Sequence, residues 1–296
     1  MLCLIDADIL VYEIASSGQF TNDEGVLVIR DFEFVAELLD QKIKEICGEC
    51  WSDEPPLLFL TNDTTLNRLN NRHRKTQGLE PLVYIPNFRI DVAKAKPYKG
   101  TRKSEKPFHR DNIRAYMLNK YECVIANGME ADDMLAIYQT KAAPNTTIIC
   151  TRDKDLRMVE GMHYGWPCGK QPQYGPKRVD KLGELTYVNN KLKGEGSKFF
   201  YSQLITGDSV DNIPGLPGGG PKLAFELLES KDSEGDMFTA VADRYANKFG
   251  DGWRGKMLEQ AHLLWMCTEL NEDGSPVMCE IDEEWEDGTA YNIKPS

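Results

Sequence analysis

The chain has few of the features that would indicate export or membrane insertion. Its 296 residues contain no run of about eighteen apolar side chains, and no basic-then-apolar leader precedes the first apolar segment. We therefore expect a soluble, unexported protein with no membrane partner. The length allows one large core with a smaller appendage.

The sequence also lacks a recognisable disulfide framework or zinc motif. The eight cysteines are scattered, and Cys3 and Cys150 lie within apolar runs, which is typical of buried free thiols in a reducing compartment. Cys47 and Cys50 have a zinc-like C-x-x-C spacing but no obvious second pair, and the four histidines do not cluster. The sequence therefore does not predict a zinc site.

The net charge of −12 is unevenly distributed along the chain. The stretch from Glu269 to Ser296 contains nine acidic residues and one basic residue. The stretch from Arg89 to Arg110 contains eight basic and two acidic residues. A basic strip of this kind is typical of a surface that binds a polyanion, and a solvated loop is the alternative.

Short apolar runs alternate with segments of helical periodicity. The runs, read as buried strands, cover residues 2–5, 57–60, 123–125 and 147–150. Helical spacing of apolar residues follows at 9–15, 35–46 and 131–138. Strands that alternate with helices predict an α/β fold with a parallel sheet.

Acidic residues follow the ends of these predicted strands. Asp6, Asp63 and Asp153 each lie just past a strand, at the edge where open α/β sheets bind ligands. Each acid alone could be a turn residue or a helix cap. The full set of candidate metal ligands is Asp6, Asp63, Glu130, Asp132, Asp133, Asp153, Asp155, Asp208 and Asp211.

Such a set of carboxylates favours hard divalent cations. Crowded carboxylates repel one another unless cations neutralise them. Oxygen ligands without histidine or cysteine select Mg²⁺ or Mn²⁺. Two such ions, roughly 4 Å apart, can activate a water molecule and stabilise the leaving oxygen of a phosphodiester.

The segment from Leu204 to Leu228 combines two of these acids with a glycine-rich turn. Asp208 and Asp211 are three residues apart, a spacing that would place both on one side of a helical turn. Prolines and three consecutive glycines follow, and Pro221 then begins a second apolar helix. Helix, glycine hairpin and helix can present backbone N–H groups to a phosphate, although a surface turn is the simpler alternative.

This segment, GDSVDNIPGLPGGGPKLA, resembles the helix–three-turn–helix signature of the 5′-nuclease superfamily of flap endonucleases and 5′→3′ exonucleases. The motifs LIDADILVY, FLTND, GMEADDM and TRDKDL are similar to further motifs of that superfamily, in the same order. The resemblance is strongest to the small stand-alone enzymes of phages and bacteria. It implies a PIN-like parallel sheet flanked by helices, with a helical arch, and the nine acids as ligands of two Mg²⁺ or Mn²⁺ ions, with K⁺ at the hairpin.

The resemblance also implies catalytic and DNA-binding residues. Residues 98–102, YKGTR, are similar to a motif at the base of the arch. In the superfamily its lysine and arginine, here Lys99 and Arg102, meet the scissile phosphate, and its tyrosine, here Tyr98, stacks near the terminal base. The residues assigned to DNA binding are Arg89, Lys103, Gly215, Gly218, Gly220 and Lys222.

One region departs from the superfamily pattern. Asp63 lies 25 residues before Phe88 and 35 before Tyr98, so residues 64–87 form an apparent insertion. Whether Asp63 reaches the metals is therefore open. Asp8 forms a D-x-D pair with Asp6, and we expect it to begin a helix.

The expected organisation has two parts. Residues 1–200 would form the nuclease core, with a basic arch region at about 64–110. Residues 201–296 would form a helical region with the DNA-binding hairpin, two further helices near 238–245 and 257–265, and an acidic tail.

The implied activity is a metal-dependent hydrolase acting on DNA. It would be a 5′→3′ exonuclease or structure-specific flap endonuclease that cleaves phosphodiesters at or near 5′ ends, on substrates with 5′ ends, flaps or nicks. We expect a monomer in the cytoplasm of a bacterial or phage-infected cell. The acidic tail would be available to replication or recombination proteins.

There are three alternatives to this activity. A haloacid-dehalogenase-type phosphatase would use Asp6 as nucleophile and Asp8 as acid, but it gives no role to EADD, YKGTR or the hairpin. A non-catalytic DNA-binding relative would not need nine carboxylates, which repel DNA without a metal. An RNA-directed nuclease stays open, because 2′-hydroxyl contacts are not readable from sequence.

Overall fold

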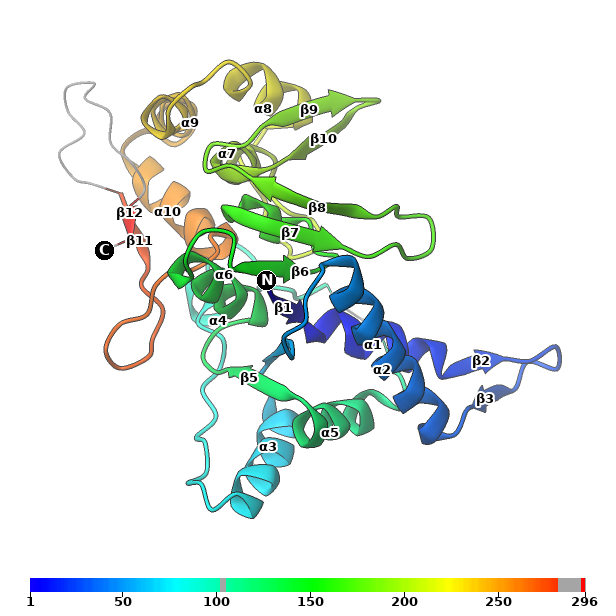
Figure 1. Cartoon of the computed structure of the whole chain (residues 1–296). Helices are drawn as coiled ribbons and strands as arrows, with labels where there is room; N and C mark the ends of the chain where they lie inside the picture. Colours follow the sequence, from blue (N-terminus) through cyan, green and yellow to red (C-terminus); the bar gives the residue numbers. More distant parts are fainter. Residues whose placement is uncertain (102–104, 282–293, 296) are drawn as a thin grey trace. The chain divides into compact units, whose positions relative to one another are not determined.

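The computed structural model describes residues 1–101, 105–281 and 294–295, and these form two compact units (Figure 1). The first, here called the sheet unit, comprises Met1–Asn87, Lys103–Arg152 and Gly161–Arg178. The second, the helical unit, comprises Phe88–Arg102, Asp153–Glu160 and Val179–Ser296. Each unit is built from three stretches of chain, so the units do not follow a single cut at residue 200. The predicted domain division stays a prediction.

The sheet unit contains a six-stranded sheet in the order β5-β4-β1-β6-β7-β8. The β1–β4, β1–β6, β4–β5 and β6–β7 pairs are all parallel, which confirms the α/β fold with a parallel sheet. The strands are β1 (Leu2–Asp6), β4 (Leu57–Thr61), β5 (Glu122–Ala126), β6 (Thr147–Cys150), β7 (Gly161–Gly165) and β8 (Tyr174–Val179).

Helices pack on this sheet because its strands are apolar on both sides. Leu58 and Leu60 of β4 belong to a core shared with α1, α2 and α5, whereas the ring of Phe59 contacts Tyr138 of α6. The helices are α1 (Ala7–Ser17), α2 (Phe32–Glu49), α3 (Thr64–Thr76), α5 (Arg110–Lys120) and α6 (Ala131–Lys141). These two sets of contacts give the layered arrangement that the sequence predicts.

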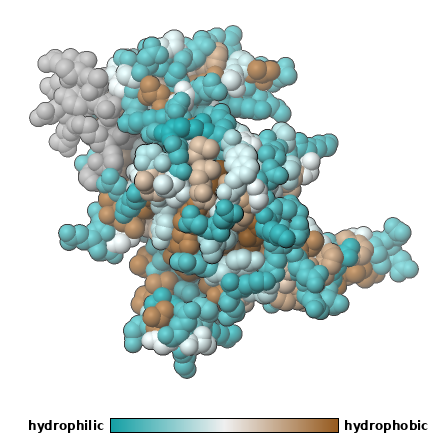
Figure 2. All heavy atoms as spheres, viewed as in Figure 1, coloured by the Kyte–Doolittle hydropathy of each residue, from teal (hydrophilic) through white to brown (hydrophobic). Residues whose placement is uncertain are grey.

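A small hairpin extends the sheet unit beyond its core. It consists of β2 (Gln19–Thr21) and β3 (Leu27–Ile29), which pair antiparallel. Phe20 and Leu27 of this hairpin are exposed, and Figure 2 shows hydrophobic atoms among hydrophilic ones over it.

The helical unit has a core of its own. It includes Leu204, Phe238 and Met257, and the buried Tyr245 hydroxyl donates to the Leu204 carbonyl at 2.6 Å. Its elements are α4 (Arg89–Val92), the 3₁₀ helix η1 (Asp155–Met158), β9 (Leu185–Val188), β10 (Lys191–Gly194), α7 (Gly196–Thr206), α8 (Pro221–Leu228), α9 (Glu234–Phe249), the 3₁₀ helix η2 (Gly250–Gly252), α10 (Trp253–Leu264), β11 (Cys279–Glu280) and β12 (Lys294–Pro295). The two helices expected near 238–245 and 257–265 are therefore confirmed.

The region expected to form an arch differs from the expectation. Residues 64–76 of the apparent insertion form α3, which packs against α5. Among the described residues from 89 to 109, the only helix is the four-residue α4. Most of the acidic tail, residues 282–293, lies outside the described residues. No helix in the described part of the chain is long and apolar enough to cross a membrane.

Candidate active site

Asp6 occupies the carboxyl end of β1 and also begins α1. Its Oδ1 accepts a hydrogen bond from the Ile9 N–H at 3.3 Å, and its Oδ2 accepts one from the Thr151 hydroxyl at 2.7 Å. Thr151 directly follows β6, the strand beside β1. Only 1% of Asp6 is exposed. The ends of two adjacent parallel strands are thus joined through a buried carboxylate, at the sheet edge where the sequence predicts a site.

Asp8 lies at the same edge, in the first turn of α1 as expected. Its Oδ2 accepts a hydrogen bond from the Thr61 N–H at 3.0 Å. Burial raises the pKa of Asp8, hydrogen bonds from Thr61 oppose this shift, and the charge of Glu130 adds to it. Asp8 therefore shares an acidic environment with Glu130. Sequence reasoning placed Asp8 outside the site, although its D-x-D spacing to Asp6 was the available signal.

The first turn of α6 supplies three of the predicted ligands. Glu130 caps this helix, and Asp133 Oδ2 accepts a hydrogen bond from the Glu130 N–H at 3.1 Å. The Ala131 N–H donates to Thr61 Oγ1 at 2.8 Å and so ties α6 to the end of β4. Asp133 is fully buried and Asp132 is half-buried. Among the described residues of this unit, no three carboxylates bring their oxygens within 4.8 Å of one another.

Asp63 has a different role from the one predicted for it. It caps α3, with Oδ1 accepting hydrogen bonds from the Thr65 and Leu66 N–H groups at 2.9 and 2.8 Å. Its Oδ2 forms ion pairs with Arg110 at 2.8 Å and Arg114 at 3.0 Å. Burial alone would raise the pKa of Asp63. The hydrogen bond from the Leu66 N–H and the two guanidinium groups outweigh this effect, so the pKa of Asp63 is lowered overall.

These contacts use both oxygens of Asp63 and neutralise its charge. The structure therefore does not bring Asp63 to the acidic edge as an open ligand. The physical reason is local, because α3 begins immediately after Asp63 and needs a cap there. Arg110, counted in the basic strip, is 9% exposed and serves this ion pair.

In the helical unit, an ammonium group lies between two predicted metal ligands. Lys154 Nζ is 2.9 Å from Asp155 Oδ1 and 3.0 Å from Asp208 Oδ2. Asp155 Oδ1 also accepts a hydrogen bond from Gln203 Nε2 at 2.7 Å. Asp153 Oδ1 accepts one from the Asp155 N–H at 2.8 Å. Three of the four predicted ligands of this unit are thus connected through a short network.

The carboxylates of this network have shifted acidities. Burial, and then the charge of Asp153, raise the pKa of Asp155 to about 6. Burial also raises the pKa of Asp208, but Lys154 and the backbone N–H groups of its own turn lower it overall. Burial lowers the pKa of Lys154, and the two carboxylates more than reverse this effect. The negative charge here is partly buried and stabilised by positive charge.

Asp208 and Asp211 lie in a closed turn, where the sequence predicts a helical turn. Helix α7 ends at Thr206, and Gly207 has a left-handed φ of 67°. The Asp208 N–H donates to the Ile213 carbonyl at 3.0 Å, and the Ile213 N–H donates back at 2.7 Å. Asp208 Oδ1 also accepts from the Val210 N–H at 2.7 Å, which stabilises the turn rather than a helix.

The YKGTR motif contacts this turn within the same unit. The Tyr98 hydroxyl donates to Asp211 Oδ2 at 3.1 Å, and Lys99 Nζ lies 3.8 Å from the same oxygen. The Lys99 N–H donates to the Asp211 carbonyl at 3.0 Å, and Asn212 Nδ2 donates to the Pro97 carbonyl at 2.8 Å. The predicted phosphate-contacting residues and a predicted metal ligand are thus brought together. Arg102 and Lys103 lie outside the described residues.

The glycines of the hairpin differ in what they do. Gly218 has a φ of 87°, in the left-handed region, and a Cβ there would meet no atom within 4 Å. Gly220 is extended at φ −160°, a conformation that any residue adopts. Gly215 is buried with a φ of 68°, and a Cβ there would lie 2.4 Å from the Gly207 nitrogen. Its role is close backbone packing, which corrects its assignment to DNA contact. Lys222, at the start of α8, is 72% exposed.

Arg89 is not available to DNA, so its assignment to DNA binding is wrong. It is 2% exposed, its Nε donates to the Leu263 carbonyl at 3.1 Å, and its Nη2 donates to the Trp265 carbonyl at 2.7 Å. Carbonyls at the end of a helix lack intrahelical partners, and Arg89 satisfies two of them at the end of α10. Among the described bases of the strip, Lys94, Lys96 and Lys106 are exposed.

Comparison with known proteins gives sequence relatives but no family model that matches the chain. DNA polymerase I of Rhizobium leguminosarum is 37% identical over 136 residues, which cover 45% of this chain and 12% of the polymerase. A 5′-3′ exonuclease of Mycobacterium tuberculosis is 29% identical over 201 residues, 60% of this chain and 61% of that protein. Flap endonuclease Xni of Shewanella baltica is 29% identical over 146 residues, 49% of this chain and 52% of that protein.

A solved structure has the same fold. The T5 D15 protein, crystallised with metal ions, matches with a TM-score of 0.51 and 13% identity over 88% of each chain. The chain thus spans less than two thirds of the sequence relatives described here, whereas the structural match extends over most of both proteins. The fold is that of an α/β protein with a mostly parallel six-stranded sheet flanked by helices. In its ordered acidic motifs and in the sequence relatives it matches, the chain is similar to 5′-3′ exonucleases and flap endonucleases.

Proposed function

We propose that this protein is a divalent-metal-dependent 5′→3′ exonuclease or flap endonuclease that hydrolyses DNA phosphodiesters at or near 5′ ends. The observation that carries the proposal is the contact of Tyr98 and Lys99 with Asp211. It joins a side chain suited to a phosphate with one suited to a metal ion. The names of the sequence relatives, a 5′-3′ exonuclease and a flap endonuclease, support the same activity.

The donor set fits a hard divalent cation. In the helical unit, the Lys154 ammonium already lies between the Asp155 and Asp208 carboxylates, so positive charge is stabilised at that point. In the sheet unit, Asp8 and Glu130 are close enough for the charge of one to raise the pKa of the other. Carboxylate oxygens without thiol or imidazole partners favour Mg²⁺ or Mn²⁺. The residues proposed to hold metal are Asp6, Asp8, Glu130, Asp132, Asp133, Asp153, Asp155, Asp208 and Asp211.

A bound divalent ion would lower the pKa of a water molecule and stabilise the leaving oxygen. The residues of the chain would orient the substrate around it. Lys99, placed by its backbone bond to Asp211, would stabilise the charge that develops on the scissile phosphate. The Tyr98 hydroxyl fixes the tyrosine ring against the turn, and the Lys99 ammonium lies 5.0 Å from the centroid of that ring.

The hairpin of residues 214–220 would bind the duplex backbone at a point away from the reacting phosphate. Gly218 and Lys222 are exposed, as backbone-directed contacts require. Such contacts would not read the base sequence. A K⁺ ion at this hairpin, a contact of the acidic tail with replication or recombination proteins, and a monomeric state stay predictions.

A cleavage assay with defined substrates tests the proposal. The purified chain would be given 5′-labelled flap, nicked, blunt-duplex and RNA substrates, with Mg²⁺ or with chelator. We expect Mg²⁺-dependent cleavage of the DNA substrates, abolished in Asp155→Asn and unchanged in Asp243→Asn, an exposed acid of α9 in the same unit. Cleavage of RNA alone would identify an RNA-directed nuclease, and no cleavage of any substrate would reject the proposal.

A further inference from the structure

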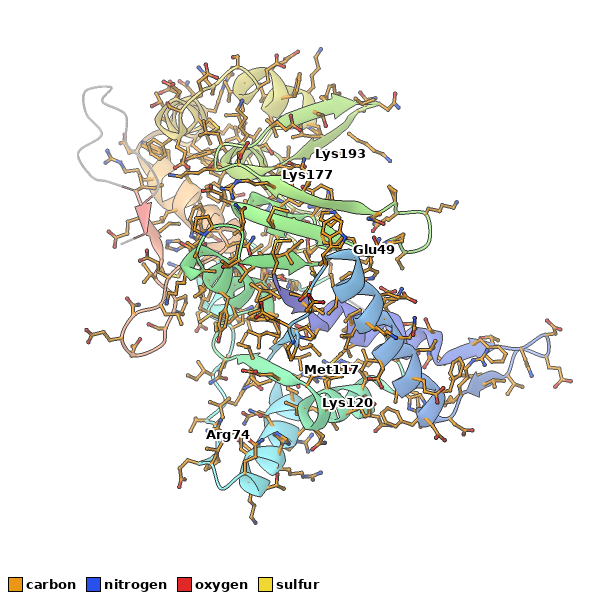
Figure 3. The ribbon with its side chains drawn as sticks, in the orientation of Figure 1. Glu49, Arg74, Met117, Lys120, Lys177 and Lys193 are labelled. Carbon is orange, nitrogen blue, oxygen red and sulfur yellow. The ribbon has the colours of Figure 1, made fainter. Side chains whose placement is uncertain are left out.

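Four cysteines that are far apart in the sequence come together in the sheet unit. Cys3 lies in β1 and Cys150 ends the neighbouring strand β6. Ile5 is paired with Cys150, so Cys3 and Cys150 are diagonal neighbours on one face of the sheet. Cys47 lies in the last turn of α2, and Cys50 directly follows the last residue of that helix, Glu49, which is labelled in Figure 3.

The thiols of this group are close and shielded from solvent. The sulfurs of Cys3, Cys50 and Cys150 all lie within 4.8 Å of one another, and each of these residues is 0% exposed. The Cys50 and Cys150 sulfurs are 3.6 Å apart. Cys47 is half-buried against the same core, and its side chain contacts that of Cys3. We call these four residues the thiol group.

The end of α2 holds the C-x-x-C pair in a defined conformation. The Cys50 N–H donates to the Ile46 carbonyl at 3.1 Å, and the Ser52 N–H donates to the Cys47 carbonyl at 3.0 Å. Trp51 between them has a left-handed φ of 49°, a conformation that few non-glycine residues adopt. Side chains three apart at a helix end lie on one side of the helix, so Cys47 and Cys50 belong to the same side of α2.

We propose that Cys3, Cys47, Cys50 and Cys150 bind one zinc ion in a closed, structural site. Zinc takes four thiolates tetrahedrally at about 2.3 Å, which places neighbouring sulfurs nearly 4 Å apart. The Cys50 and Cys150 sulfurs, 3.6 Å apart, fit the separation of two sulfurs in such a tetrahedron. This separation is too long for a disulfide bond of about 2.05 Å. An iron–sulfur cluster would hold its thiolates farther apart than a single ion does. A C-x-x-C pair joined by two further thiols is a common zinc ligand set.

The proposed site is separate from the nuclease chemistry but is built on the same strands. β1 carries Cys3 and ends in Asp6, and β6 ends in Cys150, next to Thr151. The zinc ion would join the end of α2 to both strands, whose ends the Asp6–Thr151 hydrogen bond also connects. With four protein ligands it has no open position for substrate, so its contribution would be to stability.

Zinc analysis of the full-length chain tests this inference. The protein would be purified without chelator, its zinc measured by mass spectrometry, and the bound ion displaced with an organomercurial in the presence of a chromogenic chelator. We expect about one zinc ion per chain, released as the organomercurial modifies the thiols. Reconstitution of metal-free protein with Co²⁺ should give the intense visible absorption of a tetrahedral tetrathiolate site.

Matched variants separate this site from the other thiols and from the carboxylates. Cys47→Ser, at the half-buried member, should lose zinc and lower the melting temperature. Cys123→Ser, on β5 of the same sheet but outside the group, should keep zinc, and so should Asp132→Asn. If the Cys47→Ser variant does not fold, the Co²⁺ spectrum of the unsubstituted chain still tests whether the four thiols bind a metal ion.

Three results would overturn the inference. One is a chain without zinc that gives no Co²⁺ thiolate spectrum under reducing conditions. Another is bound iron with the brown absorption of an iron–sulfur cluster. The third is zinc lost equally from Cys123→Ser or Asp132→Asn. None of these outcomes depends on whether the protein cleaves DNA.

Discussion

The Tyr98 hydroxyl donates a hydrogen bond to Asp211 Oδ2 at 3.1 Å, across 113 positions of the sequence. The Lys99 ammonium approaches the same oxygen at 3.8 Å. A tyrosine expected to stack on a base and a lysine expected to contact a phosphate therefore share one carboxylate. This contact makes the position of the lysine dependent on the turn between Asp208 and Ile213, so the proposed metal ligand and the proposed phosphate contact share one carboxylate.

Lys99→Ala should slow the chemical step more than it weakens DNA binding. The ammonium would stabilise charge that develops in the transition state, and removal of one such group costs about 10²–10³-fold in rate. Single-turnover kinetics at saturating enzyme measure this. Lys94→Ala, an exposed lysine of the same basic strip, is the matched control and should retain its rate. A loss of affinity alone in Lys99→Ala would make Lys99 a simple phosphate anchor.

Metal binding in the helical unit should weaken below about pH 6. Burial and the charge of Asp153 raise the pKa of Asp155 to about 6, so the carboxylate is ionised above that pH and takes up a proton as the pH falls through it. Because a cation binds the ionised form, each unit of pH below 6 should cost up to tenfold in affinity through this group.

Calorimetric titration of the DNA-free protein with Mn²⁺ at pH 5 and pH 7.5 checks this dependence. Asp155→Asn removes the titrating group, so its residual binding should change less between the two pH values. An equal pH dependence in the variant would assign the effect to another carboxylate.

Gly219→Ala and Gly220→Ala should behave differently although the two positions are adjacent. A Cβ at Gly219 would lie 2.3 Å from the Ile205 carbonyl oxygen, which is backbone and cannot move without disturbing α7. A Cβ at Gly220 meets no atom within 4 Å, and its φ of −160° suits any residue. We expect Gly219→Ala to lower the melting temperature by several degrees, which corresponds to about 1–3 kcal/mol. Thermal unfolding of both variants measures this difference. Equal melting temperatures would contradict the close packing of Gly219 against the Ile205 carbonyl.

Lys222→Ala should weaken binding to every duplex alike. Lys222 is exposed beside the hairpin, and its loss should reduce the slope of log affinity against log salt concentration by about one unit. Fluorescence anisotropy with two unrelated duplex sequences at several salt concentrations measures the slope. A change that differs between the two sequences would indicate base contacts instead.

Asp63→Asn should reduce stability and leave metal binding intact. The carboxylate caps α3 and pairs with Arg110 and Arg114, and the amide leaves these two largely buried guanidinium groups with Asp111 as their remaining carboxylate partner. We expect a loss of about 1–3 kcal/mol in the free energy of unfolding, measured by denaturant titration. Unchanged stability with weaker Mn²⁺ binding would restore Asp63 as a ligand.

The sequence predicts the parts of the fold whose signals are local. Four strands were predictable because each is a continuous apolar run, whereas β7 and β8, GMHYG and YGPKRV, contain none. Arg89 stands in a basic strip, and charge patterning alone does not distinguish an exposed arginine from one that binds helix-end carbonyls. The role of Asp63 depends on arginines 47 and 51 residues later in the chain. The thiol group could not be predicted from the sequence either, because only the pairing of β1 with β6 brings Cys3 and Cys150 together.

The interleaving of the two units limits how the protein can be divided for experiments. A fragment that begins at Val179 would contain the whole glycine hairpin and α7–α10, and it would seem a natural DNA-binding piece. It would lack residues 88–102 and 153–160, which belong to the same compact unit. Asp208 would lose Lys154, and Asp211 would lose Tyr98 and Lys99. Point substitutions in the intact chain, rather than truncations, are therefore the suitable way to separate DNA binding from cleavage.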